Sequence, residues 1–160
     1  CPARHKLLTH VSNFREVNRV KDVVRVFARV RRTMPAVLLM IGDGPERDDA
    51  ERESRDLGVA GDVRFLGRID AVAPLLQQSD LFLLPTQTES FGLAALDALA
   101  CGVPVVGSRA GGLPELIRDG VEGILCDPRD PDALAGAIRR CLEDAGLRRR
   151  LAGNGASLWE

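Results

Sequence analysis

Short apolar runs alternate with amphipathic stretches along the whole chain, and this rhythm predicts strands and helices in turn. Apolar runs too short for a buried helix predict six strands, at residues 7–11, 36–41, 63–66, 80–84, 105–106 and 124–126. The clearest helix has apolar side chains at the i, i+3, i+4, i+7 spacing of a buried face, at Val20, Val23, Val24, Phe27 and Val30. The pattern therefore predicts a mixed α/β chain.

Residues that start or end helices support the remaining assignments. Further helices are expected near residues 46–57, 70–78, 91–100, 114–118, 132–142 and from 147 onward. Gly58 is expected to end the first of these as a C-cap, and Pro114 suits a first helical turn. Asp70 and Asp132 are the expected N-caps, because a short carboxylate can accept a hydrogen bond from the first turn.

Strands that are apolar on both faces and separated by helices indicate a parallel sheet covered on both sides. The fold class predicted is a single α/β domain with a doubly wound, Rossmann-like sheet of about six strands. In such sheets ligands bind beyond the carboxyl ends of the strands, where helix N-termini expose N–H groups. The loops to inspect are therefore residues 12–19, 42–45, 67–69, 85–92 and 107–112.

Composition and charge exclude several classes of function. The 160 residues contain 22 Lys and Arg against 23 Asp and Glu, which argues against a broad nucleic-acid binder but allows a local anion pocket. No apolar run approaches the roughly 20 residues of a membrane-spanning helix. The 4 cysteines are scattered, so neither a zinc site nor a disulfide framework is expected. Free cysteines are typical of a reducing compartment, and a cytoplasmic location is therefore expected.

The run ESFGLAALDALACGVPVV at residues 89–106 carries the strongest candidate chemistry. Glu89 lies in the loop after a predicted strand, and Asp97 follows eight positions later inside the next helix. Unpaired N–H groups at the start of that helix favour an anion, and Gly92 would let a phosphate approach closely. A carboxylate two turns along can accept hydrogen bonds from two ribose hydroxyls. The alternative is that Glu89 caps the helix and Asp97 is a solvated surface residue.

This run resembles the donor-nucleotide signature of retaining glycosyltransferases built from two Rossmann-like domains, the GT-B type, which carry an E-x7-E motif. Further blocks resemble that family in the same order: IGDGP at 41–45, FLG at 65–67, GGLPELI at 111–117 and DGVEGIL at 119–125. The resemblance covers nearly all of the chain. It implies that residues 1–160 are the C-terminal, donor-binding domain. The N-terminal acceptor domain is expected to be missing, since the chain opens without Met.

The opening block HVSNFREVNRVKDVV at residues 10–24 is unusual within the family, because Ser12 and Asn13 replace a common glycine-arginine pair. It resembles the subfamily that joins N-acetylglucosamine to L-malate in bacillithiol biosynthesis. UDP-N-acetylglucosamine is then the implied donor and L-malate the implied acceptor. Two positions depart from the pattern. Asp97 is one methylene shorter than the usual glutamate, which puts its reach to the ribose hydroxyls in question. Asn18 stands where the subfamily has a lysine, so one positive charge at the phosphate is missing unless Arg19 or Arg15 supplies it.

The resemblance also implies a role for each site residue. Glu89 is the candidate catalytic residue, acting either as a nucleophile or, as we favour, as the group that orients the sugar during same-face attack. Asp97 would hold the ribose, while Arg15 and Arg19 would neutralise the diphosphate. The candidate donor-binding residues are Asp97, Ser90, Phe91, Gly92, Leu93, Ser12, Asn13, Arg15, Arg19, Gly42, Gly44, Arg68 and Ile69. No metal is expected, because arginines and the helix dipole can supply the positive charge.

Other interpretations stay open for some of these residues. Gly42 and Gly44 are equally explained by a tight turn, and Arg68 by a surface charge. The only histidines, His5 and His10, show no nucleophile–base pairing and are expected to be satisfied or solvated.

Three alternative functions remain. The same fold could serve a lipid-linked or polysaccharide acceptor, or the chain could be a non-catalytic nucleotide-binding module. A dinucleotide-dependent dehydrogenase would need a GxGxxG after the first strand, where this chain has SNF at residues 12–14. The chain alone is expected to bind UDP weakly and to be inactive. Homo-oligomer formation is left open.

Overall fold

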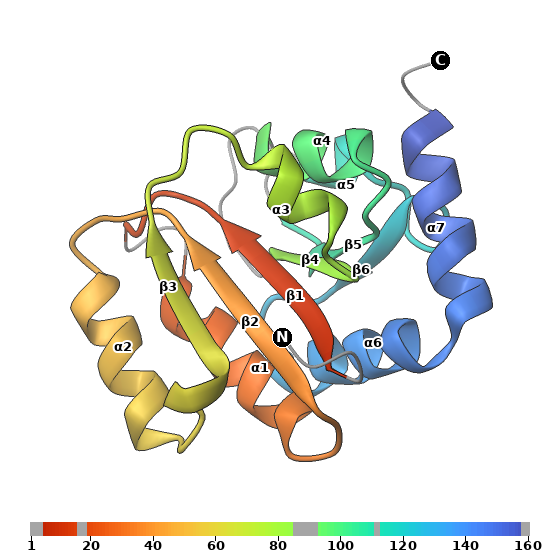
Figure 1. The fold of residues 1–160 in the computed structure, drawn as a ribbon. Helices are drawn as coiled ribbons and strands as arrows, with labels where there is room; N and C mark the ends of the chain where they lie inside the picture. Colours follow the sequence, from red (N-terminus) through yellow and green to blue (C-terminus); the bar gives the residue numbers. More distant parts are fainter. Residues whose placement is uncertain (1–4, 16–18, 85–92, 111–112, 158–160) are drawn as a thin grey trace.

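A computed structural model describes residues 5–15, 19–84, 93–110 and 113–157. The described residues form six strands in one sheet (Figure 1). The strands are β1 (Lys6–Val11), β2 (Ala36–Ile41), β3 (Val63–Gly67), β4 (Leu81–Leu84), β5 (Val105–Ser108) and β6 (Gly123–Cys126). All neighbouring pairs are parallel.

The order of the strands is β3-β2-β1-β4-β5-β6. The chain moves outward from β1 to β3, returns to the centre at β4, and then moves outward to β6. The point where the order reverses, between β1 and β4, is where a doubly wound sheet opens a crevice at its carboxyl edge. The predicted Rossmann-like sheet is confirmed.

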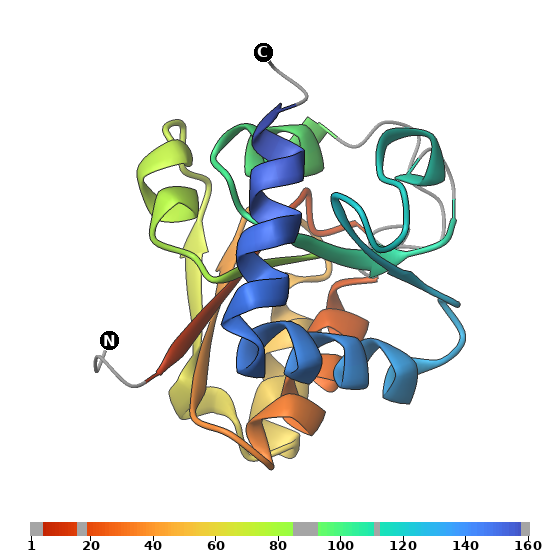
Figure 2. The same cartoon turned by 90° about the vertical axis from the view of Figure 1, so that its right-hand side faces the viewer.

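Helices connect the strands and form the two outer layers. They are α1 (Val20–Arg31), α2 (Arg47–Asp56), the 3₁₀ turn η2 (Ala60–Asp62), α3 (Ala73–Gln77), α4 (Leu93–Ala100), α5 (Leu113–Leu116), α6 (Pro131–Glu143) and α7 (Ala145–Ser157). One hydrophobic cluster joins α1, α2 and α6 to one face of the sheet. A second cluster joins α3, α4 and α5 to the other face. The terminal helix α7 contacts both α4 and α6 (Figure 2).

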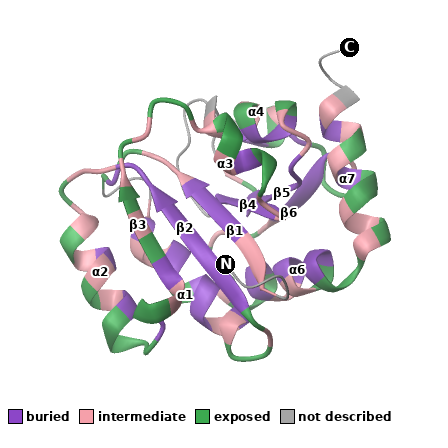
Figure 3. Ribbon diagram, in the orientation of Figure 1, coloured by how far each residue is buried: buried purple, intermediate pink, exposed green. Residues whose placement is uncertain are grey.

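Burial explains why the central strands are continuous apolar runs. Every residue of β2 and of β4 is buried, since helices cover both faces of these strands (Figure 3). The edge strand β3 instead alternates, with Val63 buried and Arg64 exposed. No helix among the described residues is long and apolar enough to cross a membrane.

The two predicted N-caps are wrong, and proline explains both errors. The short helix expected to start at Asp70 begins at Ala73, because Pro74 is tolerated only within a first turn, and no side-chain cap is found among the described residues there. The expected C-cap is one position off: Leu57 is the C-cap of α2, and Gly58 follows it with a left-handed φ of 75°.

At α6 the cap lies two residues before the predicted one. Pro131 is the first residue of the helix, so Asp130 is the N-cap, and its Oδ1 accepts a hydrogen bond of 3.0 Å from the N–H of Ala133. Asp132 lies inside the first turn, where its carboxylate accepts a 2.9 Å hydrogen bond from Arg29.

This correction predicts different effects for two neighbouring aspartates. Asp130→Ala removes the partner of an otherwise unsatisfied N–H and is expected to lower the free energy of unfolding by about 1 kcal/mol. The matched control Asp132→Ala removes an exposed ion pair and is expected to cost less than about 0.5 kcal/mol. Urea unfolding of both variants measures the difference. Equal losses, or a larger loss for Asp132→Ala, would contradict the assignment of the cap.

Candidate functional site

The turns that follow β1 and β2 lie directly against each other at the carboxyl edge of the sheet. Gly42 is buried with φ 135°, and a Cβ at this position would lie 1.8 Å from the carbonyl oxygen of Ser12. A Cβ on Gly44 would lie 2.7 Å from the carbonyl oxygen of Phe14. The N–H of Gly42 also donates to the carbonyl oxygen of Gly67, at 2.8 Å, at the end of β3. Both glycines are therefore required by the close approach of backbones, as the tight-turn interpretation holds.

Asp43 fixes the shape of the turn after β2. One of its carboxylate oxygens accepts a 2.8 Å hydrogen bond from the N–H of Gly44, and the other accepts a 3.2 Å hydrogen bond from Arg47. The Gly44 N–H, together with the positive charges of Arg47 and Arg68, lowers the pKa of Asp43. Because Gly42 contacts both Ser12 and Gly67, the turns after β1, β2 and β3 converge on one region. Ile69 follows Arg68 and is half-buried.

His10 is a fully buried histidine near the end of strand β1, beside β4. Its Nδ1 lies 2.8 Å from the carbonyl oxygen of Leu83, its Nε2 lies 2.7 Å from Oγ of Ser12, and its ring stacks on Phe82 with centroids 6.4 Å apart. A carbonyl can only accept, so Nδ1 carries the proton and Nε2 accepts from the Ser12 hydroxyl. Burial lowers the pKa of His10 to about 4, although the hydrogen bond to Leu83 opposes this shift.

This arrangement changes what Ser12 can do. Its only hydroxyl proton is held by His10, so the Ser12 oxygen meets a ligand as an acceptor. Satisfied or solvated histidines are expected from the sequence: this is confirmed for His10, whereas Nδ1 of His5 is buried with no hydrogen-bond partner among the described residues. What sequence reasoning missed is the link to Ser12, whose neighbour Asn13 is exposed and lies in the same turn.

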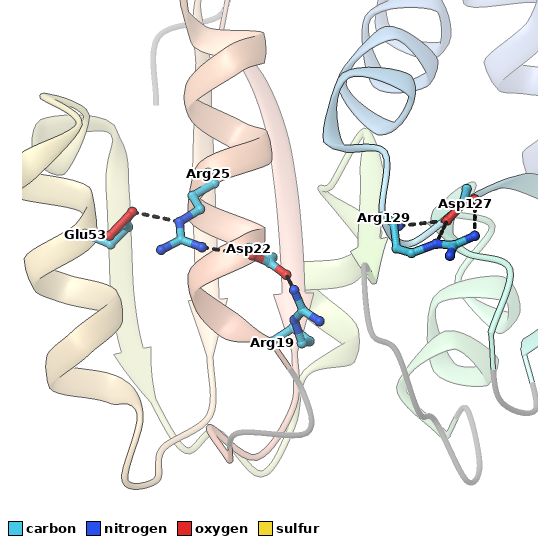
Figure 4. Close-up of polar contacts among 6 residues, drawn as sticks. All are labelled: Arg19, Asp22, Arg25, Glu53, Asp127 and Arg129. Atoms are coloured by element: carbon cyan, nitrogen blue, oxygen red, sulfur yellow. Dashed lines mark hydrogen bonds and ion pairs between the residues drawn. The ribbon is translucent and has the colours of Figure 1, made fainter.

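The two arginines predicted at the diphosphate lie in different surroundings. Arg15 is exposed in the turn after β1. Arg19 is the N-cap of α1, and it is the single non-glycine residue with positive φ in the described ranges. Its guanidinium lies 2.5 Å from Oδ2 of Asp22 on the same helix (Figure 4). Arg19 is thus turned along α1 in this conformation.

The acidic motif is only partly within the described residues. Asp97 is exposed on α4, one turn after Leu93, the first residue of that helix. Its charge adds to burial in raising the pKa of Cys101 one turn further on, with burial the larger cause. Glu89, Ser90, Phe91 and Gly92 lie outside the described residues, so the geometry of the acidic pair stays a prediction.

Ser108 is a further polar residue that sequence reasoning did not single out. It is the last residue of β5, is fully buried, and its Oγ has no hydrogen-bond partner among the described residues. A buried hydroxyl normally has a partner. Ser108 therefore marks a polar position at the same carboxyl edge, and its place in the segment 107–112, which follows a predicted strand, was the signal available in the sequence.

The fold and this polar carboxyl edge define a Rossmann-like α/β domain. Residues 2–158 match the model of the family described as glycosyl transferases group 1, and the chain belongs to this family. The N-acetyl-alpha-D-glucosaminyl L-malate synthase of Bacillus anthracis is 46% identical over 146 residues, which are 91% of this chain and 38% of that protein. A glycogen synthase of Mycobacterium tuberculosis is 37% identical over 148 residues, 91% of this chain and 36% of that protein.

Solved structures show the same architecture. The Anabaena protein Alr3699/HepE in complex with UDP and glucose has a TM-score of 0.90 and 28% identity, covering 98% of this chain and 44% of that one. The present chain thus spans well under half of the relatives that it matches. These comparisons confirm the family and the GT-B fold neighbourhood predicted from the sequence.

The low pKa of His10 predicts a specific acid sensitivity. Well above pH 6.5, the ordinary pKa, His10 is neutral in both the folded and the unfolded chain, so its titration does not change stability there. As the pH falls from 6.5 towards about 4, only the unfolded chain binds the proton, so stability is lost. Between pH 7.5 and 5 we expect His10 to account for a loss of about 2 kcal/mol in the free energy of unfolding, measured by urea unfolding.

The matched variant is His10→Gln, which keeps a donor and an acceptor but does not titrate. Its free energy of unfolding should fall by correspondingly less over the same pH range. Parallel pH profiles for the two proteins would show that His10 does not titrate as its burial implies.

Proposed function

We propose that this chain is the donor-binding, C-terminal domain of a retaining glycosyltransferase that transfers N-acetylglucosamine from UDP-N-acetylglucosamine to L-malate. The observation that carries the proposal is the 46% identity to the malate synthase of Bacillus anthracis over 91% of the chain. The donor role is supported by the similarity to a structure that contains UDP and glucose, and by the convergence of three strand-end turns on one region. The acceptor domain is proposed to lie in sequence that this chain does not include.

The proposed chemistry is the departure of a diphosphate from the anomeric carbon. As the C1–O bond breaks, negative charge grows on the leaving oxygen, and Arg15, Arg19 and the N-terminus of the helix that contains Asp97 stabilise it. Asp97 accepts hydrogen bonds from the ribose, and Glu89 orients the sugar for attack on the same face. The Ser12 oxygen, whose proton His10 holds, accepts from a hydroxyl of the donor rather than donating to a phosphate. Donor binding is proposed to need no metal.

A second candidate function keeps this donor site and changes the acceptor. Glycogen synthase from Mycobacterium tuberculosis is 37% identical, and a D-inositol 3-phosphate glycosyltransferase from Salinispora arenicola is 35% identical over 94% of the chain. Members of the family with such different names share this domain, so the domain alone does not select the acceptor.

The contribution of Asp97 to donor binding can be measured directly. Asp97→Asn removes the charge that strengthens its hydrogen bonds to two ribose hydroxyls, and is expected to weaken UDP binding about tenfold or more. Asp97→Glu restores the charge and should retain affinity within about threefold. Titration calorimetry with UDP measures all three proteins, with Glu143→Gln, an exposed acid at the end of α6, as the control. Unchanged affinity in Asp97→Asn would rule out the ribose contact.

The acceptor is tested with the full-length protein that contains this domain. UDP is expected to be released from UDP-N-acetylglucosamine when L-malate is the acceptor. The rate of release is expected to be at least about tenfold lower with glycerol, inositol phosphate or a glucan. A preference for one of these others supports the second function, and no transfer to any acceptor supports a non-catalytic nucleotide-binding module. The isolated chain is expected to show no turnover.

A further inference from the structure

A pocket of about 260 Å³ lies between α1 and the start of α6, with the segment that leads into α6. Four arginines line it: Arg19, Arg25 and Arg29 from α1 and its cap, and Arg129 from the segment between β6 and α6. Asp22 is the one acidic residue of the lining within the described ranges. Figure 4 shows Arg19, Asp22 and Arg25 in a row along α1, with Arg129 on the neighbouring segment.

Three of these arginines have partners outside the lining, and Arg25 is also paired with Asp22 inside it, at 3.3 Å. Arg25 pairs with Glu53 at 2.8 Å, Arg29 with Asp132 at 2.9 Å, and Arg129 with Asp127 at 3.3 Å. The wall itself carries four guanidinium groups and one carboxylate, and the carboxylates of Glu53, Asp132 and Asp127 balance the other three charges from just outside it. An anion would therefore bind here by taking the place of carboxylates that already pair with the arginines.

The existing ion pairs do not block an incoming anion. The side chains of Arg25 and Arg129 are 45% and 82% exposed. Exposed pairs of this kind contribute only about 0–1 kcal/mol each, so a guanidinium can exchange its carboxylate for another anion at small cost. The planar guanidinium matches a phosphoryl group in particular, because two N–H groups can bind two of its oxygens at once.

The pocket is also small and lies between two packed helices. Val26 of α1 and Leu134 of α6 are buried and form its apolar side, and Pro131 restricts the backbone at the start of α6. The walls therefore come mainly from two packed helices. Its volume lies just below the roughly 300–1,000 Å³ of pockets that hold drug-sized ligands, which favours a small, highly charged molecule.

We propose that this pocket binds a small phosphorylated anion that carries at least two negative charges. The pocket lies on the helix layer formed by α1, α2 and α6, whereas Asp97 lies on α4, which covers the opposite face of the sheet. Arg19 is the residue that the pocket shares with the predicted donor contacts. The phosphate is proposed to belong to a separate small molecule rather than to the nucleotide, and saturating the chain with UDP tests this.

Pyrophosphate is the probe, titrated by calorimetry into the chain in the presence of saturating UDP. We expect binding to persist under UDP and to weaken with rising salt. The double variant Arg29→Gln, Arg129→Gln changes two arginines of the pocket that are not among the donor candidates. It should weaken pyrophosphate about tenfold or more while leaving the affinity for UDP unchanged. The control Arg52→Gln removes an exposed arginine of α2, paired with Asp49, and should have no effect.

A second variant serves as a control for loss of structure. Arg29→Lys, Arg129→Lys keeps both charges but loses the forked geometry, and should bind pyrophosphate more weakly than the parent protein and more tightly than the glutamine variant. Thermal unfolding establishes that both variants are folded. The inference is overturned if pyrophosphate does not bind, if the glutamine variant binds it as well as the parent, or if UDP displaces it. Failure of UDP to bind at all would instead contradict the proposed donor role, and the pyrophosphate titration would then be made without it.

Discussion

The contact between the turn after β2 and the turn after β1 determines the geometry of the carboxyl edge. The backbone of Gly42 approaches the carbonyl of Ser12 so closely that any side chain would overlap it. The same residue donates its N–H to Gly67, so three consecutive strand ends are held together by main-chain atoms. Since main-chain contacts are insensitive to most substitutions, the surrounding side chains can vary while the turns keep their positions. Asp43 then completes the turn by binding Gly44 and Arg47.

The second constraint acts across the point where the strand order reverses. His10 connects β1 to β4 through the carbonyl of Leu83 and orients the hydroxyl of Ser12. Because burial keeps the ring neutral, the direction of both hydrogen bonds is fixed at physiological pH. In the proposed function, these fixed hydrogen bonds give the carboxyl edge a defined order of groups. A hydrogen-bond acceptor lies at Ser12, and cationic side chains follow along the chain at Arg15 and Arg19. A sugar nucleotide carries matching groups: hydroxyl donors and an anionic diphosphate.

Much of this architecture could be predicted from the sequence, because it depends on local pattern. The apolar run of β2 and the helical spacing of α1 specify their elements directly, and both are buried as expected. The caps near Asp70 and Asp132 were mispredicted because each helix start is set by a neighbouring proline rather than by the best capping residue.

Features that depend on contacts between distant residues could not be predicted in this way. His10 and Leu83 are separated by 73 positions, and no local pattern pairs them. Arg29 and Arg129 line one pocket only because α1 packs against α6. The E-x7-D pair was identified by its resemblance to a family, and with Glu89 outside the described residues its geometry stays a prediction.

The central claim is that the carboxyl edge of the sheet binds the nucleotide part of a sugar donor. Hydrogen–deuterium exchange of the chain with and without UDP tests it most directly, since backbone amides at a bound edge exchange more slowly. The account predicts slower exchange with UDP in the turns after β1, β2 and β3, at residues 12–15, 42–46 and 67–69, and in the first turn of α4. Protection confined to the opposite edge, at residues 32–35, 57–62 and 101–104, or no protection at saturating UDP, would contradict it.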